Sequence, residues 1–448
     1  MPPATDLLNL DLLQRIPLSA RTVLDVGCGA GGFLRAYRRA NPKARLLGID
    51  RDPEAAAQAA RHMDQVAALD VETQALPFDV PQGIDCIIYS AVLEHLRDPW
   101  AVLRRHAGAL APDGMMLICT SNVEHWSLIE RLLRGTWDYE NAGLLDRSHL
   151  RWFSLETMRK GIEELGLSLC DIQPRVFGNE AGQAFAKAME PALFNLGISP
   201  DAWWQRAAPL QFVFRARKTP RERMLIAATM LDPIGGVSHV RVVYPLQAMM
   251  SDPMISTMLT TSGEMPDFAA GMPRILILHR PALTGPAGLA AMRKLADAGW
   301  LLVIEFDDHP SAFQAMQQDE NWTFRAAHAV QTSTPALAEV MRQHNPEIAV
   351  FPNAILSLPE VRNFSDPSSV TLFFGALNRE RAWAPLMPAL NAVAHKAGDR
   401  LNFQVMHDRV FFDALETPHK AFTPTSGHDA YLDLLSRCEI SFMPLADD

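Results

Sequence analysis

The stretch VLDVGCGAGG, residues 23–32, decides the fold of the first part of this chain. It starts as a short apolar run, typical of a buried strand, and ends in a cluster of glycines. The residues that follow, GGFLRAYRRAN (31–41), have helical character. Glycines at a strand-to-helix turn let the backbone bend tightly and approach a ligand closely. Because open α/β sheets bind ligands at this place, the stretch predicts a ligand-binding glycine loop.

Six more apolar runs follow, and most are separated by helical segments. With TVLDVG (22–27) they make seven predicted strands: RLLGID (45–50), QVAALD (65–70), DCIIYS (85–90), MMLICTS (115–121), LSLCDIQPRVF (167–177) and PLQFVFRARK (209–218). Strands that are apolar on both faces, with helices between them, indicate a parallel sheet covered on both sides. Residues 180–205 read as a helical excursion between the last two strands.

A second alternating series begins after RARKTPRER (215–223), which is basic, contains proline and is expected to be a linker. Its predicted strands are MLIAATML (224–231), ISTMLTT (255–261), RILILHR (274–280), LLVIEFDD (301–308), AHAVQTS (327–333) and IAVFPN (348–353). A third series contains VTLFFGA (370–376), LNFQVMHD (401–408) and EISFMPLADD (439–448). The fold class is therefore α/β, in three parts: 1–218, 219–365 and 366–448.

Composition limits the possible functions. The 448 residues carry a formal net charge of -10, which argues against broad nucleic-acid binding but leaves room for a local nucleotide site. The five cysteines are scattered, as expected for free thiols in a reducing compartment. The N-terminus lacks the features of a signal peptide, and no apolar run is long enough to cross a bilayer. We expect a cytoplasmic protein without stable membrane insertion.

The glycine loop also fits the pattern G-x-G-x-x-G through Gly27, Gly29 and Gly32, which alone would suit a nicotinamide dinucleotide equally well. Asp25, two residues before the first glycine, favours another ligand. A carboxylate there would repel a pyrophosphate, whereas a ligand with an ammonium and a sulfonium group meets no such repulsion.

Two further carboxylates are expected at the ends of neighbouring strands. Asp50 ends the second predicted strand and could accept hydrogen bonds from both hydroxyls of a ribose. Asp70 ends the third and could accept a hydrogen bond from an adenine amino group. Together with Asp25 they would suit a neutral nucleoside with a cationic tail.

The order of these motifs resembles that of class I S-adenosylmethionine (SAM)-dependent methyltransferases: VLDVGCGAGGF, GID, ALD, YSAVLEHLRDP and LAPDG. The segment GTWDYENAGLLDRSHLRWFSLETM (135–158) resembles the bacterial surface-glycan and ubiquinone-type O-methyltransferases. The resemblance covers residues 1–218. It implies SAM as cofactor and a seven-stranded sheet whose last strand is antiparallel. It also implies a set of cofactor-binding residues: Asp25, Gly27, Gly29, Asp50, Asp70 and Ser90.

Methyl transfer to a hydroxyl needs an acceptor held in line and a base for its proton. His95 follows the fourth strand and could face the methyl group, although Glu94 and His95 could instead only shape the cofactor pocket. His149 lies where the resemblance places the cover of the acceptor. Its alternative is an Asp146–His149 pair at the start of a helix.

Asn122 and His125 follow the fifth strand. They could line the acceptor pocket or merely terminate the strand. No pair of residues has H-x-x-x-H or another firm metal-ligand spacing, so we expect no required metal.

The second half resembles GT-B glycosyltransferases of the retaining, surface-polysaccharide kind, through segments such as VIEFDDHP (303–310) and VTLFFGALNRERAW (370–383). The resemblance implies that Gly235 and Gly236 approach the donor phosphates or the acceptor. It also implies that Arg379 or Arg381 pairs with the donor diphosphate, unless the two arginines form only a solvated charged turn. The resembling family continues beyond the point where this sequence stops, so we expect an incomplete last lobe.

The sequence therefore predicts a bifunctional protein of surface-polysaccharide assembly. Its first half would methylate a sugar hydroxyl of a sugar nucleotide or lipid-linked glycan, and its second half would bind or transfer a sugar from a nucleotide donor. One alternative is a small-molecule or quinone-type O-methyltransferase with a non-catalytic glycan-binding module. A nicotinamide-linked oxidoreductase is disfavoured by Asp25.

Overall fold

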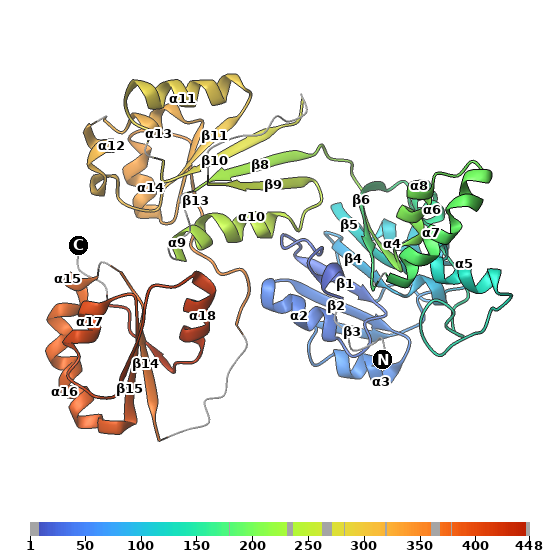
Figure 1. Cartoon of the computed structure of the whole chain (residues 1–448), viewed down its shortest axis with the longest axis horizontal. Coiled ribbons are helices and arrows are strands. Elements are labelled where there is room, and N and C mark those ends of the chain that lie inside the picture. Colours follow the sequence, from blue (N-terminus) through green and yellow to red (C-terminus); the bar gives the residue numbers. More distant parts are fainter. Residues whose placement is uncertain are drawn as a thin grey trace.

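The computed structural model describes residues 9–178, 180–230, 236–261, 271–281, 283–318, 320–359, 368–377 and 379–444. The chain forms three α/β sheets in succession, of seven, six and four strands. In Figure 1 the first sheet and its helices run from blue to green, the second from yellow-green to orange, and the third is orange-red to red.

The first sheet confirms the seven predicted strands. Its order is β3-β2-β1-β4-β5-β7-β6, and the last strand, β7, is antiparallel to both of its neighbours. The strands are β1 (Thr22–Val26), β2 (Arg45–Asp50), β3 (Gln65–Ala68), β4 (Ile84–Ser90), β5 (Leu110–Ser121), β6 (Ser168–Arg175) and β7 (Gln211–Arg217). The glycine loop thus leaves the middle of the sheet, where the order of the parallel strands reverses.

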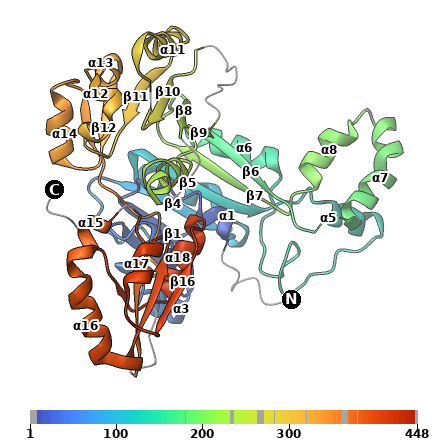
Figure 2. The same cartoon turned by 60° about the vertical axis from the view of Figure 1, so that its left-hand side comes forward.

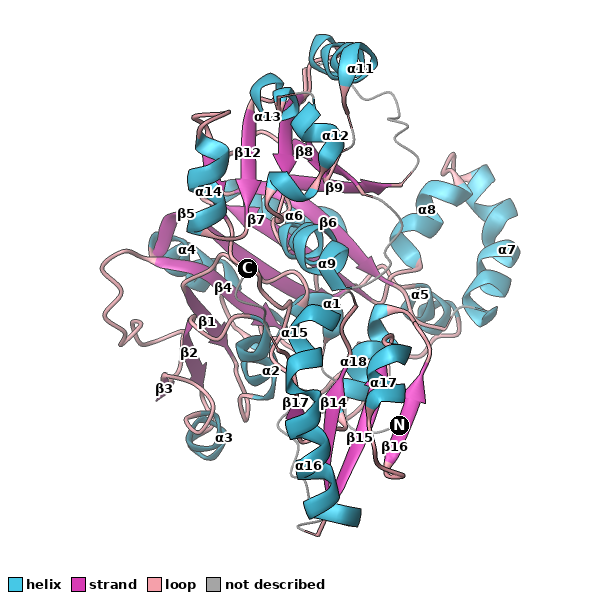
Figure 3. Cartoon of the chain, turned by 90° about the vertical axis from the view of Figure 1, so that its left-hand side faces the viewer, coloured by secondary structure: helices cyan, strands magenta, loops and turns pink. Residues whose placement is uncertain are grey.

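Helices cover both faces of this sheet. They are α1 (Leu10–Leu13), α2 (Gly32–Ala40), α3 (Pro53–Ala59), α4 (Pro99–Gly108), α5 (Trp126–Leu133), α6 (Leu155–Glu164), α7 (Glu180–Asn195), α8 (Pro200–Ala207) and the short 3₁₀ helix η1 (Leu93–His95). One apolar core joins α1, α2 and α3 to the sheet, and a second joins α4 and α6. The predicted excursion is confirmed as α7 and α8, which project from the sheet in Figures 2 and 3.

The second sheet is parallel throughout, in the order β13-β12-β11-β10-β8-β9. Its strands are β8 (Met224–Thr229), β9 (Ile255–Thr260), β10 (Arg274–His279), β11 (Leu301–Glu305), β12 (Ala329–Thr332) and β13 (Ile348–Val350). Its helices are α9 (Gly236–Ser238), the π-helix η2 (His239–Val243), α10 (Tyr244–Met249), α11 (Gly285–Asp297), η3 (Pro310–Ala312), α12 (Gln314–Gln318), α13 (Trp322–Ala326) and α14 (Pro335–Arg342).

The third sheet is also parallel, in the order β16-β15-β14-β17. Its strands are β14 (Val370–Phe374), β15 (Leu401–Met406), β16 (Lys420–Thr423) and β17 (Ile440–Ser441). Its helices are α15 (Glu380–Trp383), η4 (Ala384–Leu386), α16 (Met387–Ala397), η5 (Gly398–Arg400), α17 (Arg409–Ala414) and α18 (His428–Ser436). The sequence did not predict β16, and β17 lies at the edge of the sheet with both residues exposed.

The first two parts of the chain meet at a buried junction. Arg217 in β7 pairs with Asp252 at 3.0 Å, and Arg215 donates a hydrogen bond to the carbonyl of Ser251 at 2.8 Å. Ser251 also accepts a hydrogen bond from the backbone of Leu18 at 3.0 Å. The predicted linker 215–223 is therefore wrong in its first three residues, because these belong to β7.

His428 of α18 connects the third part to the second. His428 forms a 2.7 Å hydrogen bond to the Tyr244 hydroxyl and stacks on the ring of His239, with centroids 4.2 Å apart.

Within the described ranges, no helix has the length and the apolar composition needed to cross a bilayer.

Candidate functional site

The glycine loop connects β1 to α2 through three glycines in left-handed backbone conformations. Gly27, Gly29 and Gly31 have φ angles of 74°, 51° and 81°, which residues with a Cβ atom rarely adopt. The loop is fixed to the neighbouring strand because the backbone amides of Gly27 and Cys28 donate to the carbonyl of Ile49.

Two of these glycines are packed closely and one faces open space. A Cβ atom on Gly27 would lie 2.6 Å from a methyl group of Val92, and one on Gly31 would lie 2.9 Å from the Cα of Ala59. A Cβ atom on Gly29 would meet nothing within 4 Å. The loop therefore presents bare peptide on its open side, as the sequence predicts for close approach of a ligand.

Asp50 and Asp25 supply negative charge beside this bare peptide. Asp50 lies at the end of β2, where its carboxylate accepts hydrogen bonds from the amides of Gly29 at 2.8 Å and Asp52 at 2.9 Å. Asp25 is only 3% exposed. Burial, and then the nearby charge of Asp50, raises the pKa of Asp25 to about 7. Two carboxyl groups held so close together favour a cationic partner.

The start of α2 offers the opposite charge. Its N-cap residue, Gly31, provides no side-chain cap, so the first amide groups of the helix remain free to bind an anion. A carboxylate of a ligand would be stabilised there. The carboxyl groups and the uncapped helix together suit a zwitterionic amino-acid group, such as the methionine part of SAM.

The remaining predicted cofactor residues lie along the same edge of the sheet. Asp70 follows β3, is exposed and accepts a hydrogen bond from the amide of Glu72 at 2.8 Å. Ser90 ends β4 and is half-buried. Because β3, β2, β1 and β4 are consecutive in the sheet, this edge carries the six predicted residues side by side: Asp25, Gly27, Gly29, Asp50, Asp70 and Ser90.

The structure brings the two candidate bases together. The rings of His95 and His149 meet edge to face, with centroids 4.9 Å apart. The Nδ1 atom of His95 lies 3.2 Å from the carbonyl of Ser148, and that of His149 lies 3.3 Å from the carbonyl of Leu144. Because a carbonyl only accepts, each Nδ1 carries a hydrogen, so the lone pair of the unprotonated form of each ring lies on Nε2.

Asp146 organises the turn that holds these rings. Its carboxylate accepts hydrogen bonds from both the amide and the hydroxyl of Ser148. These bonds, followed by the charges of His149 and His95, hold the pKa of Asp146 below its usual range. The alternative of a helix start at Asp146 and His149 is wrong, because α6 begins at Leu155 and is capped by Ser154.

Glu94 has a larger structural role than the sequence indicated. It is 1% exposed, and one oxygen of its carboxylate accepts a 2.6 Å hydrogen bond from the amide of Ser121. Its backbone carbonyl accepts from the amides of Leu150 and Arg151. Its second carboxylate oxygen has no hydrogen-bond partner in the described part of the chain. Glu94 thus ties the end of β4 to β5 and to the turn that carries His149.

Asn122 and His125 have structural partners. The amide of Asn122 donates to the carbonyls of Arg206 at 2.7 Å and Pro209 at 2.8 Å, and the residue is 1% exposed. His125 caps α5, and burial lowers its pKa to about 4. Asn122 thus ties the end of β5 to the segment before β7, and His125 begins α5, while an acceptor-binding role of either residue stays a prediction.

Of the predicted site residues of the second half, Gly236 and Arg379 each lie near a residue of the other part. Gly235 lies outside the described residues. A Cβ atom on Gly236 would lie 3.4 Å from the ring of His428. Burial raises the pKa of Asp308, and the charges of Arg280 and Arg379 oppose that rise, so Arg379 lies near Asp308. Arg381 is exposed in α15.

No group of three or more His, Cys, Asp and Glu side chains suited to a metal ion occurs within the ranges that the structure describes.

Residues 5–171 match the family model of a methyltransferase domain. The N-terminal part of the chain carries a SAM-dependent methyltransferase domain. The match ends inside β6, whereas the sheet of the methyltransferase domain continues to Arg217 in β7.

Curated relatives of the methyltransferase domain act on different kinds of acceptor. Trans-aconitate 2-methyltransferase of Methylobacterium nodulans is 35% identical over 126 residues, which are 28% of this chain and 47% of that protein. Ubiquinone biosynthesis O-methyltransferase of Xylella fastidiosa is 34% identical over 113 residues, which are 24% of this chain and 45% of that protein. The chain spans about half the length of these relatives.

Solved structures show a distant likeness. A SAM-dependent methyltransferase from Archaeoglobus fulgidus is 18% identical, covers 45% of this chain and 87% of its own, and has a TM-score of 0.32. The plantazolicin methyltransferase BpumL in complex with SAH is 17% identical, covers 45% of this chain and 77% of its own, and has a TM-score of 0.31.

Proposed function

We propose that this protein transfers a methyl group from SAM to a sugar hydroxyl in surface-polysaccharide biosynthesis. The observation that carries the methyl-transfer part is the sheet edge that combines bare peptide at Gly29 with the carboxyl groups of Asp25 and Asp50. These features fit SAM, whose adenosine is neutral and whose methionine part is charged. The glycan assignment rests on the fusion to a second half that resembles a glycosyltransferase.

The cofactor supplies an electrophilic methyl group, and the residues of this chain bind and orient it. Asp50 faces the glycine loop and can accept hydrogen bonds from ribose hydroxyls. Asp25 offsets positive charge from beneath the loop, and the uncapped start of α2 receives the carboxylate. Asp70 is placed to accept from the adenine amino group.

The His95–His149 pair would then remove the acceptor proton. Each ring keeps its Nε2 lone pair because its Nδ1 donates to a backbone carbonyl. SAM would supply the methyl group by giving up its S–CH3 bond and leaving as the thioether SAH, and one of the two Nε2 atoms would take the proton of an acceptor hydroxyl held in line. Asp146 and Glu94 act as positioning residues, since they hold the turn on which His149 lies.

We propose in addition that the second half binds, or transfers, a sugar from a nucleotide donor. Two observations support this idea: Gly236 lies beside His428 of the third part, and the charge of Arg379 acts on Asp308 of the second. The alternative is a small-molecule or quinone-type O-methyltransferase with a non-catalytic glycan-binding module. The relatives named for ubiquinone biosynthesis favour a quinone-type acceptor.

The test is methyl transfer by the full chain from labelled SAM. Sugar nucleotides, lipid-linked glycans and phenols serve as parallel acceptors, and the product is located by mass spectrometry. We expect label on a sugar hydroxyl, and label on phenols alone would contradict the glycan assignment.

Single substitutions then test the base. His95→Ala and His149→Ala should each lower kcat by about 100-fold or more without weakening SAM binding. The control is His395→Ala, which changes an exposed histidine of α16. Near-normal turnover in both site variants would refute the assignment of the base.

A further inference from the structure

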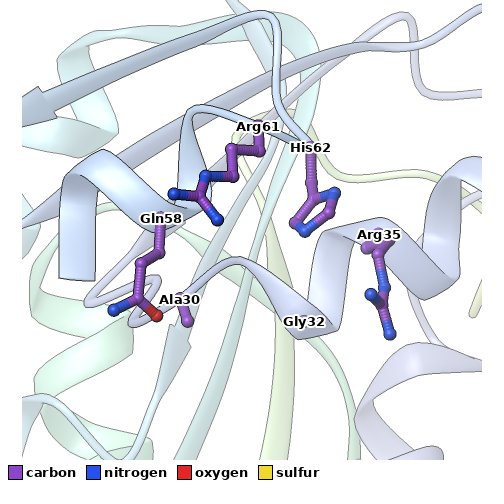
Figure 4. A pocket seen from close by; sticks show the side chains of 6 residues that line it. All are labelled: Ala30, Gly32, Arg35, Gln58, Arg61 and His62. Carbon is purple, nitrogen blue, oxygen red and sulfur yellow. The ribbon is translucent and has the colours of Figure 1, made fainter.

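A small pocket lies between α2 and the end of α3, beside the glycine loop (Figure 4). Its volume is about 270 Å³, and its lining residues are Ala30, Gly32, Arg35, Gln58, Arg61 and His62. Gln58 belongs to α3, and Arg61 and His62 follow that helix, so their side chains face α2 across the pocket. None of the six predicted cofactor residues lines the pocket, and Ala30 and Gly32 of its lining belong to the far end of the glycine loop.

The lining carries positive charge without a compensating acid. Two arginines and a histidine line the pocket, and no aspartate or glutamate does. Within the described residues, the side chains of Arg35 and Arg61 form no ion pair or hydrogen bond. Arg38, one turn further along α2, is paired with Asp64 at 2.6 Å. Both guanidinium groups are exposed to solvent and remain available to a negatively charged ligand.

The backbone at Gly32 leaves room for a ligand in this pocket. Gly32 lines the pocket and is the first residue of α2, which has no side-chain cap. A Cβ atom on Gly32 would meet nothing within 4 Å, so the space beside the helix start is open.

We propose that this pocket binds the phosphoryl group of a nucleotide or of a phosphorylated sugar, outside the methyl-transfer crevice. Guanidinium groups suit this ligand because their planar N–H groups bind two phosphate oxygens at once. Gln58 adds a neutral amide donor, and His62 adds a ring nitrogen. The volume lies just below the range of pockets that enclose a whole small molecule, so a phosphate or diphosphate fits better than an entire cofactor. The site does not depend on which acceptor is methylated.

Calorimetric titration of the full chain tests this site. The probes are inorganic phosphate, pyrophosphate, UDP and glucose 1-phosphate, each with and without saturating SAH. Arg35→Gln and Arg61→Gln should each weaken binding by about tenfold or more, and added salt should weaken binding to the unaltered protein. Arg38→Gln is the matched control, because it removes the same charge from the same helix but outside the pocket. It should change the affinity by less than about twofold.

The outcomes distinguish a nucleotide from a phosphorylated sugar as the ligand, and some of them would overturn the proposal. Tighter binding of UDP than of pyrophosphate identifies a nucleotide, and tighter binding of glucose 1-phosphate than of phosphate identifies a phosphorylated sugar. The proposal is overturned if none of the probes binds, or if the Arg35→Gln, Arg61→Gln double variant binds them as the unaltered protein does. An unchanged SAH affinity shows that the double variant is folded. If that variant fails to fold, Gln58→Leu must weaken binding for the proposal to stand.

Discussion

Asp25 shows how a single buried carboxyl group links ligand binding to stability. Its pKa of about 7 in the folded protein lies above the ordinary value of 3.8. Between these two pH values the folded protein retains a proton that the unfolded chain has released. The free energy of unfolding therefore falls by about 1.4 kcal/mol per pH unit across this window and stays at its lowered value above pH 7.

Asp25→Asn should remove this penalty. In the ligand-free protein, urea unfolding at pH 8 should show a variant that is more stable by about 1–3 kcal/mol, with a smaller gain at pH 5. Its affinity for SAM should fall by about tenfold or more because a charge is lost beside the cationic tail. An equal change of stability at both pH values would contradict the raised pKa.

Gly29 and Gly31 separate ligand binding from folding. Gly29→Ala places a methyl group in open space, so the variant should fold with a loss of about 1 kcal/mol for its left-handed backbone. The same methyl group should weaken SAM binding by about tenfold or more, since it fills the face that a ligand approaches. Gly31→Ala collides with the backbone of Ala59 and should lose several times more stability. Thermal unfolding and SAH titration measure both effects.

The sequence predicts the positions of those candidate site residues that lie at the ends of strands. Asp50 and the glycines could be predicted because a strand, its last residue and the next turn are all local features. The contact of His95 with His149 could not be derived in this way. It depends on a turn without hydrophobic periodicity, and on carbonyl groups that the fold brings to the two rings.

At the scale of elements, α6 approaches Trp100 of α4 most tightly at Gly161. A Cβ atom on Gly161 would lie 2.1 Å from the ring of Trp100. Gly161→Ala should therefore lower the free energy of unfolding by about 1–3 kcal/mol, because the helix must move or the tryptophan must leave its place. Gly108→Ala is the control.

Gly108 ends α4, and a Cβ atom there meets nothing within 4 Å. That substitution should raise stability by about 0.5 kcal/mol by restricting the unfolded chain. Urea unfolding compares the two variants, and equal effects would show that the Trp100 contact is unimportant.

Two elements of the second half, β16 and η2, could not be predicted from the sequence. The strand β16 consists of only KAFT, and the charged group of Lys420 donates to the carbonyls of Phe412 and Leu415. The residues of the π-helix η2, HVRVV, form no sequence pattern that predicts a π-helix. Its Arg241 pairs with the fully buried Glu305 at 2.7 Å, a contact between residues far apart in the chain.

At the scale of the whole molecule, the buried pair Arg217–Asp252 holds the methyltransferase domain against the second part. Asp252→Ala would leave the arginine buried without its partner and should lower the free energy of unfolding by about 3 kcal/mol. Trypsin should then cleave the connection at 218–223 faster.

The control for this prediction is Asp113→Ala, which breaks the exposed pair with Arg221. Its effect should stay below about 1 kcal/mol. Equal rates of cleavage in the two variants would contradict a stabilising role of the junction.

The place of β7 also matters while the protein is being made. This strand lies between β5 and β6, yet it is the last of the three to leave the ribosome. Translation proceeds at about 5–20 residues per second, so for several seconds β5 presents an unpaired edge and β6 has no neighbour to join. Nascent chains stalled before Gln211 should therefore recruit chaperones, and those that have passed Arg217 should release them.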